Sequence, residues 1–205
     1  MPFNQRAYAN DNTNKKKTEQ AETEPEDAYH LSVPTEEDMV KLGQSLACLK
    51  GVPSSGDVMF LFGELGVGKT VLARALIRSM SCDPELTVPS PSYLLSQVYQ
   101  ILKISEDPEE RDDMLEVHHL DLYRLQDAAA KPVSTDKLKH ILDLKNVFQQ
   151  EVAIVEWPNR LAPSEWPESR LDIHVEFEKD GDPGSRFVKL FPRGPLWRER
   201  MRQDD

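Results

Sequence analysis

Residues 63–70 read Gly-Glu-Leu-Gly-Val-Gly-Lys-Thr and match the pattern G-x-x-x-x-G-K-[ST] at every fixed position. The apolar run Val58–Phe62 comes directly before this loop and is typical of a strand buried on both faces of a parallel sheet. Residues 71–80 follow with apolar side chains at helical spacing. A strand, a glycine-rich loop and a helix in this order let backbone N–H groups surround phosphates at a helix N-terminus. The motif therefore predicts an α/β domain that binds a nucleotide.

The last two residues of the loop predict the chemistry of the site. Lys69 is placed to balance the charge of the β- and γ-phosphates, and the Thr70 hydroxyl is placed to ligate Mg²⁺. An ATPase, a GTPase and a small-molecule kinase all remain open at this point. The chain has no guanine-reading Asn-Lys-x-Asp segment, which disfavours a GTPase. A kinase lid would carry arginines, whereas residues 103–116 contain seven acids and two bases and would repel ATP.

Charge and composition restrict the remaining classes. The 205 residues carry 36 acidic and 25 basic side chains, a formal net charge of −11. Because phosphate backbones repel an acidic surface, a protein that binds nucleic acid directly through a basic face is disfavoured. Cys48 and Cys82 lie too far apart in sequence, with no Cys or His near them, to build a zinc site or a disulfide framework. No run of about 18 apolar residues is present, so we expect no membrane contact and a cytoplasmic location. Organelle import stays open because the N-terminal segment contains Arg6 and three lysines.

The composition divides the chain into three parts. Residues 1–30 lack Leu, Ile and Val and are predicted to be a disordered tail. Residues 31–205 are predicted to form a single P-loop ATPase domain with an acidic insert at about 101–116. The expected fold is α/β, a P-loop NTPase-like three-layer domain with a mostly parallel central sheet and a C-terminal antiparallel hairpin on the sheet edge. The expected helices cover residues 35–49, 71–80 and 135–150, and the further expected strands cover residues 93–99, 115–119, 152–155, 171–177 and 187–190.

Two acids stand where metal and water ligands are usually found in α/β nucleotide sites. Asp121 comes at the end of one predicted strand, and Glu156 comes just after another. Ligands in open α/β sheets bind outside the carboxyl ends of the strands, and phosphoryl transfer needs groups there that position a metal and the attacking oxygen. The alternative is that each acid caps a helix or lies on the surface. For His118 and His119 we expect packing at the strand end.

The order of four motifs resembles the TsaE family, small ATPases needed to make threonylcarbamoyladenosine in tRNA. These motifs are the glycine loop, Ser90-Pro91-Ser92-Tyr93, His119-Leu120-Asp121-Leu122-Tyr123-Arg124 and Val155-Glu156-Trp157-Pro158. The resemblance covers roughly residues 35–160. It departs from the family pattern at Met39, where a Thr is common, and at Val71, where a second hydroxyl is common.

The resemblance implies an ATP site with Mg²⁺ held by Thr70 and Glu156. It implies that Asp121 and Glu156 act in hydrolysis, Asp121 through metal-bound water or by orienting the attacking water. Ser92 would contribute a hydroxyl from a switch-like loop near the γ-phosphate, in place of the family's usual Thr. The residues expected to cradle ATP are Leu65, Gly66, Val67, Gly68, Lys69 and Thr70.

The resemblance also implies partners. TsaB-like and TsaD-like subunits would form the threonylcarbamoyl transferase complex, which ATP hydrolysis by this chain would reset between turnovers. Hydrolysis by the chain alone would be weak, and tRNA would be contacted only indirectly. A small-molecule kinase and a nucleotide-gated binding module without turnover remain the alternatives. The arginine-rich residues 193–202 are expected to form a terminal helix that packs on the domain, rather than a docking or tRNA-proximal element.

Overall fold

The computed structural model describes residues 28–102, 114–125, 142–179 and 184–202, together with the single residues 132, 134, 136, 138 and 182. The predicted N-terminal tail lies outside these residues except at its last three positions. Of the predicted acidic insert, residues 103–113 also lie outside, whereas 101–102 and 114–116 belong to strands.

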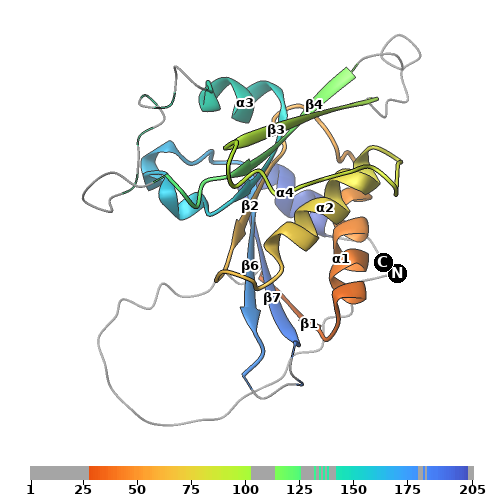
Figure 1. The fold of residues 1–205 in the computed structure, drawn as a ribbon. Coiled ribbons are helices and arrows are strands. Elements are labelled where there is room, and N and C mark those ends of the chain that lie inside the picture. Colours follow the sequence, from red (N-terminus) through yellow and green to blue (C-terminus); the bar gives the residue numbers. More distant parts are fainter. Residues whose placement is uncertain are drawn as a thin grey trace.

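The described residues form one seven-stranded sheet in the order β1-β7-β6-β2-β5-β4-β3 (Figure 1). The four central strands β6, β2, β5 and β4 run parallel to one another. The outer pairs β1/β7, β6/β7 and β3/β4 are antiparallel. The strand bounds are β1 Tyr29–Val33, β2 Val58–Phe62, β3 Ser96–Leu102, β4 Met114–Asp121, β5 Val152–Glu156, β6 Arg170–Phe177 and β7 Arg186–Arg193.

Half of the neighbouring pairs are therefore antiparallel, and the expectation of a mostly parallel sheet was correct only for its centre. The predicted C-terminal hairpin is confirmed as β6 and β7. Its placement at the sheet edge was wrong, because β1 pairs with β7 and forms that edge. The sequence pattern had indicated no strand at β1.

Helices cover both faces of the sheet, which makes the domain three-layered (Figure 1). Alternate side chains of β2 show the two faces: Met59 and Leu61 belong to one core cluster, and Val58 and Phe60 belong to the other. The first cluster contains side chains of α1 (Glu36–Ala47), α2 (Lys69–Met80) and α4 (Gly194–Met201). The second contains side chains of α3 (Leu144–Gln150). The terminal helix thus packs on the domain, as expected. Among the described residues, no helix is both long and apolar enough to cross a membrane.

Local hydrogen bonds explain where several elements begin. The Thr35 hydroxyl accepts from the Asp38 N–H at 3.1 Å and caps α1. The Asp143 carboxylate accepts from the Asn146 N–H at 3.3 Å and caps the described helix α3, which begins at Leu144. Residues 135, 137 and 139–141 of the predicted helix 135–150 lie outside the described residues. The predicted strand 93–99 was also misplaced. The Pro91 carbonyl accepts the N–H groups of residues 94 and 95 in a turn, and β3 begins only at Ser96.

Candidate functional site

The glycine loop, residues 63–70, connects β2 directly to α2. Gly66 and Gly68 have φ angles of 78° and 110°, which side chains other than glycine rarely adopt. Gly68 is the N-cap of α2 and provides no side-chain hydrogen bond to the first turn. The N–H groups of that first turn therefore face the loop at the positive end of the helix dipole, an arrangement that binds anions.

The Lys69 side chain is only 4% exposed and folds back over the loop. Its Nζ atom donates to the Gly63 carbonyl at 2.9 Å and to the Glu64 carbonyl at 2.8 Å. Burial lowers the pKa of Lys69 below its ordinary 10.5, and the nearby Glu156 and Asp121 carboxylates oppose that change. The ammonium group is thus held in a desolvated position between the loop and two acids, where a bound phosphate would interact with it strongly.

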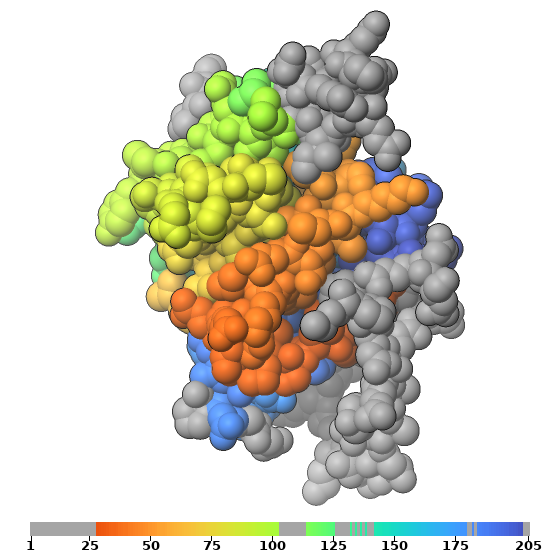
Figure 2. Space-filling view, turned by 90° about the vertical axis from the view of Figure 1, so that its right-hand side faces the viewer, coloured from red at the N-terminus to blue at the C-terminus, as the bar shows by residue number. Residues whose placement is uncertain are grey.

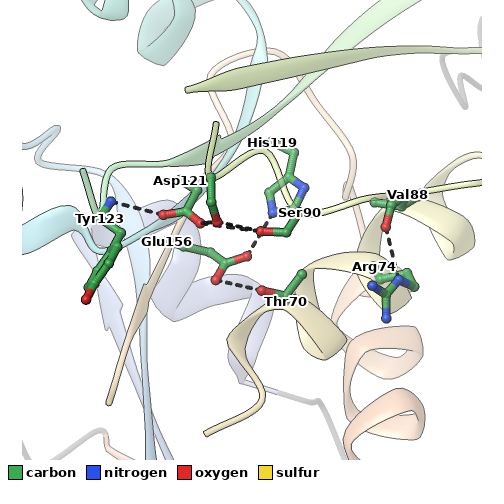
Figure 3. A network of polar contacts seen from close by, with 9 residues as sticks. Thr70, Arg74, Val88, Ser90, His119, Asp121, Tyr123 and Glu156 are labelled. Atoms are coloured by element: carbon green, nitrogen blue, oxygen red, sulfur yellow. Dashed lines mark hydrogen bonds and ion pairs between the residues drawn. The ribbon is translucent and has the colours of Figure 1, made fainter. Parts of the chain in front are cut away.

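The Glu156 carboxylate joins three elements (Figure 3). Glu156 ends β5 and is 2% exposed. Its Oε2 atom accepts from the Thr70 hydroxyl of α2 at 3.0 Å, and its Oε1 atom lies 3.0 Å from Nε2 of His119 on β4. Each oxygen has a different partner, so the carboxylate is fixed in one orientation beside the start of α2.

Asp121 ends β4 directly beside Glu156, because the parallel register pairs these two residues. Its Oδ1 atom accepts from the Tyr123 N–H at 3.0 Å. Its Oδ2 atom accepts a hydrogen bond from the Ser92 hydroxyl. The Ser90 hydroxyl lies 3.5 Å from the same oxygen (Figure 3). The Asp121 carboxylate therefore holds the loop before β3 at the strand end.

The same loop is attached to α2 one turn beyond Thr70. Arg74 Nε donates to the Val88 carbonyl at 3.1 Å, and Arg78 Nε donates to the Leu86 carbonyl at 2.9 Å. The segment between residues 86 and 95 is thus fixed to the helix that begins in the glycine loop and to the strand that carries Asp121.

Aromatic and basic side chains border the site. Trp157 follows Glu156 in the left-handed region, with φ 61° and ψ 47°, and its ring centroid lies 4.0 Å from Lys69 Nζ. The Tyr123 ring lies 5.0 Å from that ring, and Arg160 lies 5.7 Å from it. Arg124 stacks 4.3 Å from the Tyr93 ring, on the exposed side of the loop. Trp157 is half-buried and faces the loop lysine, so it belongs to the site as well as to the core beside it.

Two further side chains support the glycine loop from behind. Arg186, at the start of β7, donates from Nε to the Val67 carbonyl at 3.1 Å. The Met39 methyl group of α1 lies 3.7 Å from where a Cβ atom on Gly68 would be. Nothing in the sequence pointed to Arg186, which is 119 residues away from Val67. Met39, where the sequence departs from the family pattern, packs against the loop.

A groove of about 410 Å³ lies elsewhere, between α1 and α2. Figure 2 shows this side of the molecule, with α1 in orange and the segment that follows α2 in yellow. Arg74 and Arg78 line the groove, but none of the residues that carry the predicted chemistry does.

The structure brings the predicted site residues Lys69, Thr70, Ser92, Asp121 and Glu156 together at one end of the parallel strands. The Leu65 side chain is 69% exposed at the rim. His118 is buried and lies 3.5 Å from Glu116, which fits the expected packing at this strand. His119 does more than pack, because it contacts Glu156. Its position two residues before Asp121 on the same strand was the one available signal.

The sequence matches the family described as threonylcarbamoyl adenosine biosynthesis protein TsaE over residues 33–186. It is 32% identical over 150 residues to the protein of Mycobacterium tuberculosis named tRNA threonylcarbamoyladenosine biosynthesis protein TsaE, covering 71% of this chain and 77% of that protein. The chain belongs to the TsaE family. The Bacillus subtilis TsaE protein is 25% identical over 150 residues, covering 73% of this chain and 80% of that protein. The fold is similar to the crystal structure of Bacillus subtilis YdiB, with a TM-score of 0.57, 19% identity, and coverage of 84% of this chain and 90% of that one.

The oxygen atoms in this TsaE-family site are of the kind that Mg²⁺ prefers. Thr70 contributes a hydroxyl and Glu156 a carboxylate, 3.0 Å apart. Within the described residues, no group of three or more His, Cys, Asp or Glu side chains forms a metal cage. A magnesium ion that accompanies a nucleotide needs no such cage, because phosphates and water complete its coordination.

Proposed function

We propose that this chain is a P-loop NTPase-like ATPase that serves threonylcarbamoyladenosine formation in tRNA. One observation carries the proposal. The Thr70 hydroxyl, the Glu156 carboxylate and the Asp121 carboxylate converge beside the Lys69 ammonium, at a helix N-terminus and at the ends of two parallel strands. Membership of the TsaE family supports the assignment to this modification of tRNA.

The proposed binding roles follow from the geometry. Residues 65–70 surround the phosphates with backbone N–H groups, and Lys69 leaves its loop carbonyls to contact the β- and γ-phosphates. Thr70 and Glu156 are the residues that would hold Mg²⁺. When bound, the ion would neutralise charge on the phosphate oxygens and so favour attack at the γ-phosphorus.

The proposed catalytic role belongs to Asp121. Its carboxylate accepts a hydrogen bond from the attacking water and orients it toward the γ-phosphorus. The water oxygen bonds to that phosphorus while the bond to the bridging oxygen breaks, ADP leaves with that electron pair, and the proton of the water passes to the released phosphate. Ser92 and the Tyr123 N–H hold the carboxylate in place. The loop of Ser92 would report the state of the γ-phosphate, because Arg74 also links it to α2.

The proposed partners are TsaB-like and TsaD-like subunits, whose transferase complex the hydrolysis of ATP would reset. Large apolar side chains are exposed around the mouth of the site: Leu65 is 69%, Tyr93 84% and Leu94 71% exposed. Such side chains are typical of a surface that another protein covers. A net charge of −11 favours contact with tRNA through these subunits rather than directly.

The test is ATP turnover by the chain alone and with both partner subunits. We expect weak turnover alone, stimulation by the pair, and a loss of at least about 100-fold in Asp121→Asn and Glu156→Gln, since each loses a charge aimed at the reacting group. Glu85→Gln is the matched control, because Glu85 is an exposed acid on the turn after α2. ATP consumption only in proportion to a phosphorylated metabolite would show a kinase instead. Nucleotide binding without turnover, with the partners present, would show a binding module.

A further inference from the structure

His119 is the least exposed polar side chain of the site, with 0% of its surface accessible. It lies on β4 opposite Ile154 of β5, so Glu156 is its diagonal neighbour across the two strands. The His119 Nε2 atom lies 3.0 Å from Glu156 Oε1, and the other carboxylate oxygen is bonded to Thr70. The imidazole therefore touches the carboxylate from the side opposite to the start of α2 (Figure 3).

The hydrogen-bond partners determine what the ring does. A carboxylate oxygen only accepts, so the His119 Nε2 atom carries the hydrogen in this pair. The Nδ1 atom has no hydrogen-bond partner among the described residues. On the same face of the sheet as His119, Val117 of β4 and Ile154 of β5 are fully buried and apolar. Burying a polar ring here costs desolvation free energy that an apolar side chain would avoid. Among the described residues, the bond to Glu156 is the one hydrogen bond that the ring makes in return.

We infer that His119 is a positioning residue, whose Nε2–H fixes Glu156 so that its second oxygen stays directed at the Thr70 hydroxyl. This inference rests on the proposed function, in which Thr70 and Glu156 hold Mg²⁺. Without His119, the carboxylate can rotate about its last torsion angle, which is broad for Glu. The Thr70 hydroxyl oxygen and Glu156 Oε2, the two oxygens proposed to bind the ion, are then no longer held in place beside each other. Partners that orient metal ligands in this way commonly account for 10- to 100-fold in metal affinity.

The inference is tested by how much Mg²⁺ tightens nucleotide binding. The dissociation constant of a non-hydrolysable ATP analogue is measured calorimetrically in EDTA and in saturating Mg²⁺, and the ratio of the two values is compared among variants. In His119→Leu we expect the ratio to fall about 10-fold or more, with the constant in EDTA within about threefold of the original protein. His119→Gln, whose amide N–H reaches the place of Nε2, should keep the ratio within about threefold. His119→Asn, whose shorter amide reaches only the place of Nδ1, should behave like His119→Leu.

His118→Leu is the matched control, because His118 is also buried on β4 but contacts Glu116 instead of Glu156. It should leave the ratio unchanged. An unchanged ratio in His119→Leu, or equal ratios for His119→Gln and His119→Asn, would overturn the inference while leaving the proposed function intact. Equal affinities in EDTA and in Mg²⁺ for the original protein would instead refute the proposed magnesium site itself, and the role of His119 with it.

Discussion

Replacement of Gly63 by alanine should destabilise the whole domain, for a reason that lies in β6. A Cβ atom on Gly63 would lie 2.3 Å from the Val175 carbonyl oxygen and 2.9 Å from Val67 Cγ1. Val175 is fully buried, and β6 is paired with β7 on one side and with β2 on the other. The carbonyl can therefore move only if strand pairing is disturbed. Gly63 also has a φ of 142°, which strains any other residue.

The expected loss is the sum of two effects. The backbone conformation costs about 1–3 kcal/mol, and the overpacking costs about another 1–3 kcal/mol. Together they give about 2–6 kcal/mol, a large part of the ~5–15 kcal/mol that stabilises a typical domain. Gly66→Ala is the matched control, because φ is 78° there and no heavy atom lies within 4 Å of the added Cβ. Only the left-handed backbone is then strained, which costs about 1–2 kcal/mol.

Urea unfolding followed by circular dichroism measures both variants. With a slope of about 2 kcal/mol per molar urea, Gly63→Ala should lower the midpoint by about 1–3 M and Gly66→Ala by about 0.5–1 M. A midpoint for Gly63→Ala equal to or above that of Gly66→Ala would refute the argument that contact with β6 sets the requirement for glycine at this position.

Three further predictions concern other parts of the molecule. In steady-state kinetics, Ser92→Ala should lower the rate of ATP turnover by about 5-fold at unchanged KM, since one hydrogen bond to Asp121 is worth about 1 kcal/mol. Ser92→Thr keeps the hydroxyl and should retain the original rate. Asp57→Ala should lower the free energy of unfolding in urea by about 3–5 kcal/mol, because it leaves Arg200 of α4 without its fully buried partner. The double variant with Arg200→Met should lose less unfolding free energy than the sum of the two single variants. Burial lowers the pKa of His174 below its ordinary 6.5, against the opposing effect of nearby carboxylates. The imidazole is therefore protonated at a higher pH in the unfolded chain than in the folded one, so the folding stability falls as the pH drops from 7 to 5. His174→Phe keeps the stack on Phe62, and thermal melts of this variant should show a smaller decrease in melting temperature over that pH range.

The sequence predicted the centre of the site because the deciding patterns are local. A buried strand, a glycine loop and a helix follow one another without interruption, and Val58–Phe62 is the strand that the structure shows. Asp121 and Glu156 each end an apolar strand, so their meeting follows once those strands are parallel neighbours. The parallel pairing itself was the one non-local assumption, and it was correct.

The edges of the sheet were harder to predict, because their strands depend on distant partners. β1 has five residues, two of them polar, and it is stabilised by pairing with β7, more than 150 residues further along the chain. Tyr93 and Leu94 suggested a strand by their β-propensity, but both are exposed in the turn that Pro91 begins. The contacts of Arg186 and His119 depend on the register between strands, which single-sequence patterns do not encode.

Strands β6 and β7 have a role in the site, because each of them contacts the glycine loop. The Val175 carbonyl of β6 packs closely against Gly63, and Arg186 of β7 donates a hydrogen bond to the Val67 carbonyl. Val67 itself is fully buried, so the middle of the loop is anchored in the core while Leu65 stays exposed. A loop supported in this way keeps its N–H groups directed at a phosphate before one binds, which reduces the ordering entropy that binding must overcome. The β6/β7 hairpin therefore preorganises the loop, although it supplies none of the groups proposed to contact ATP.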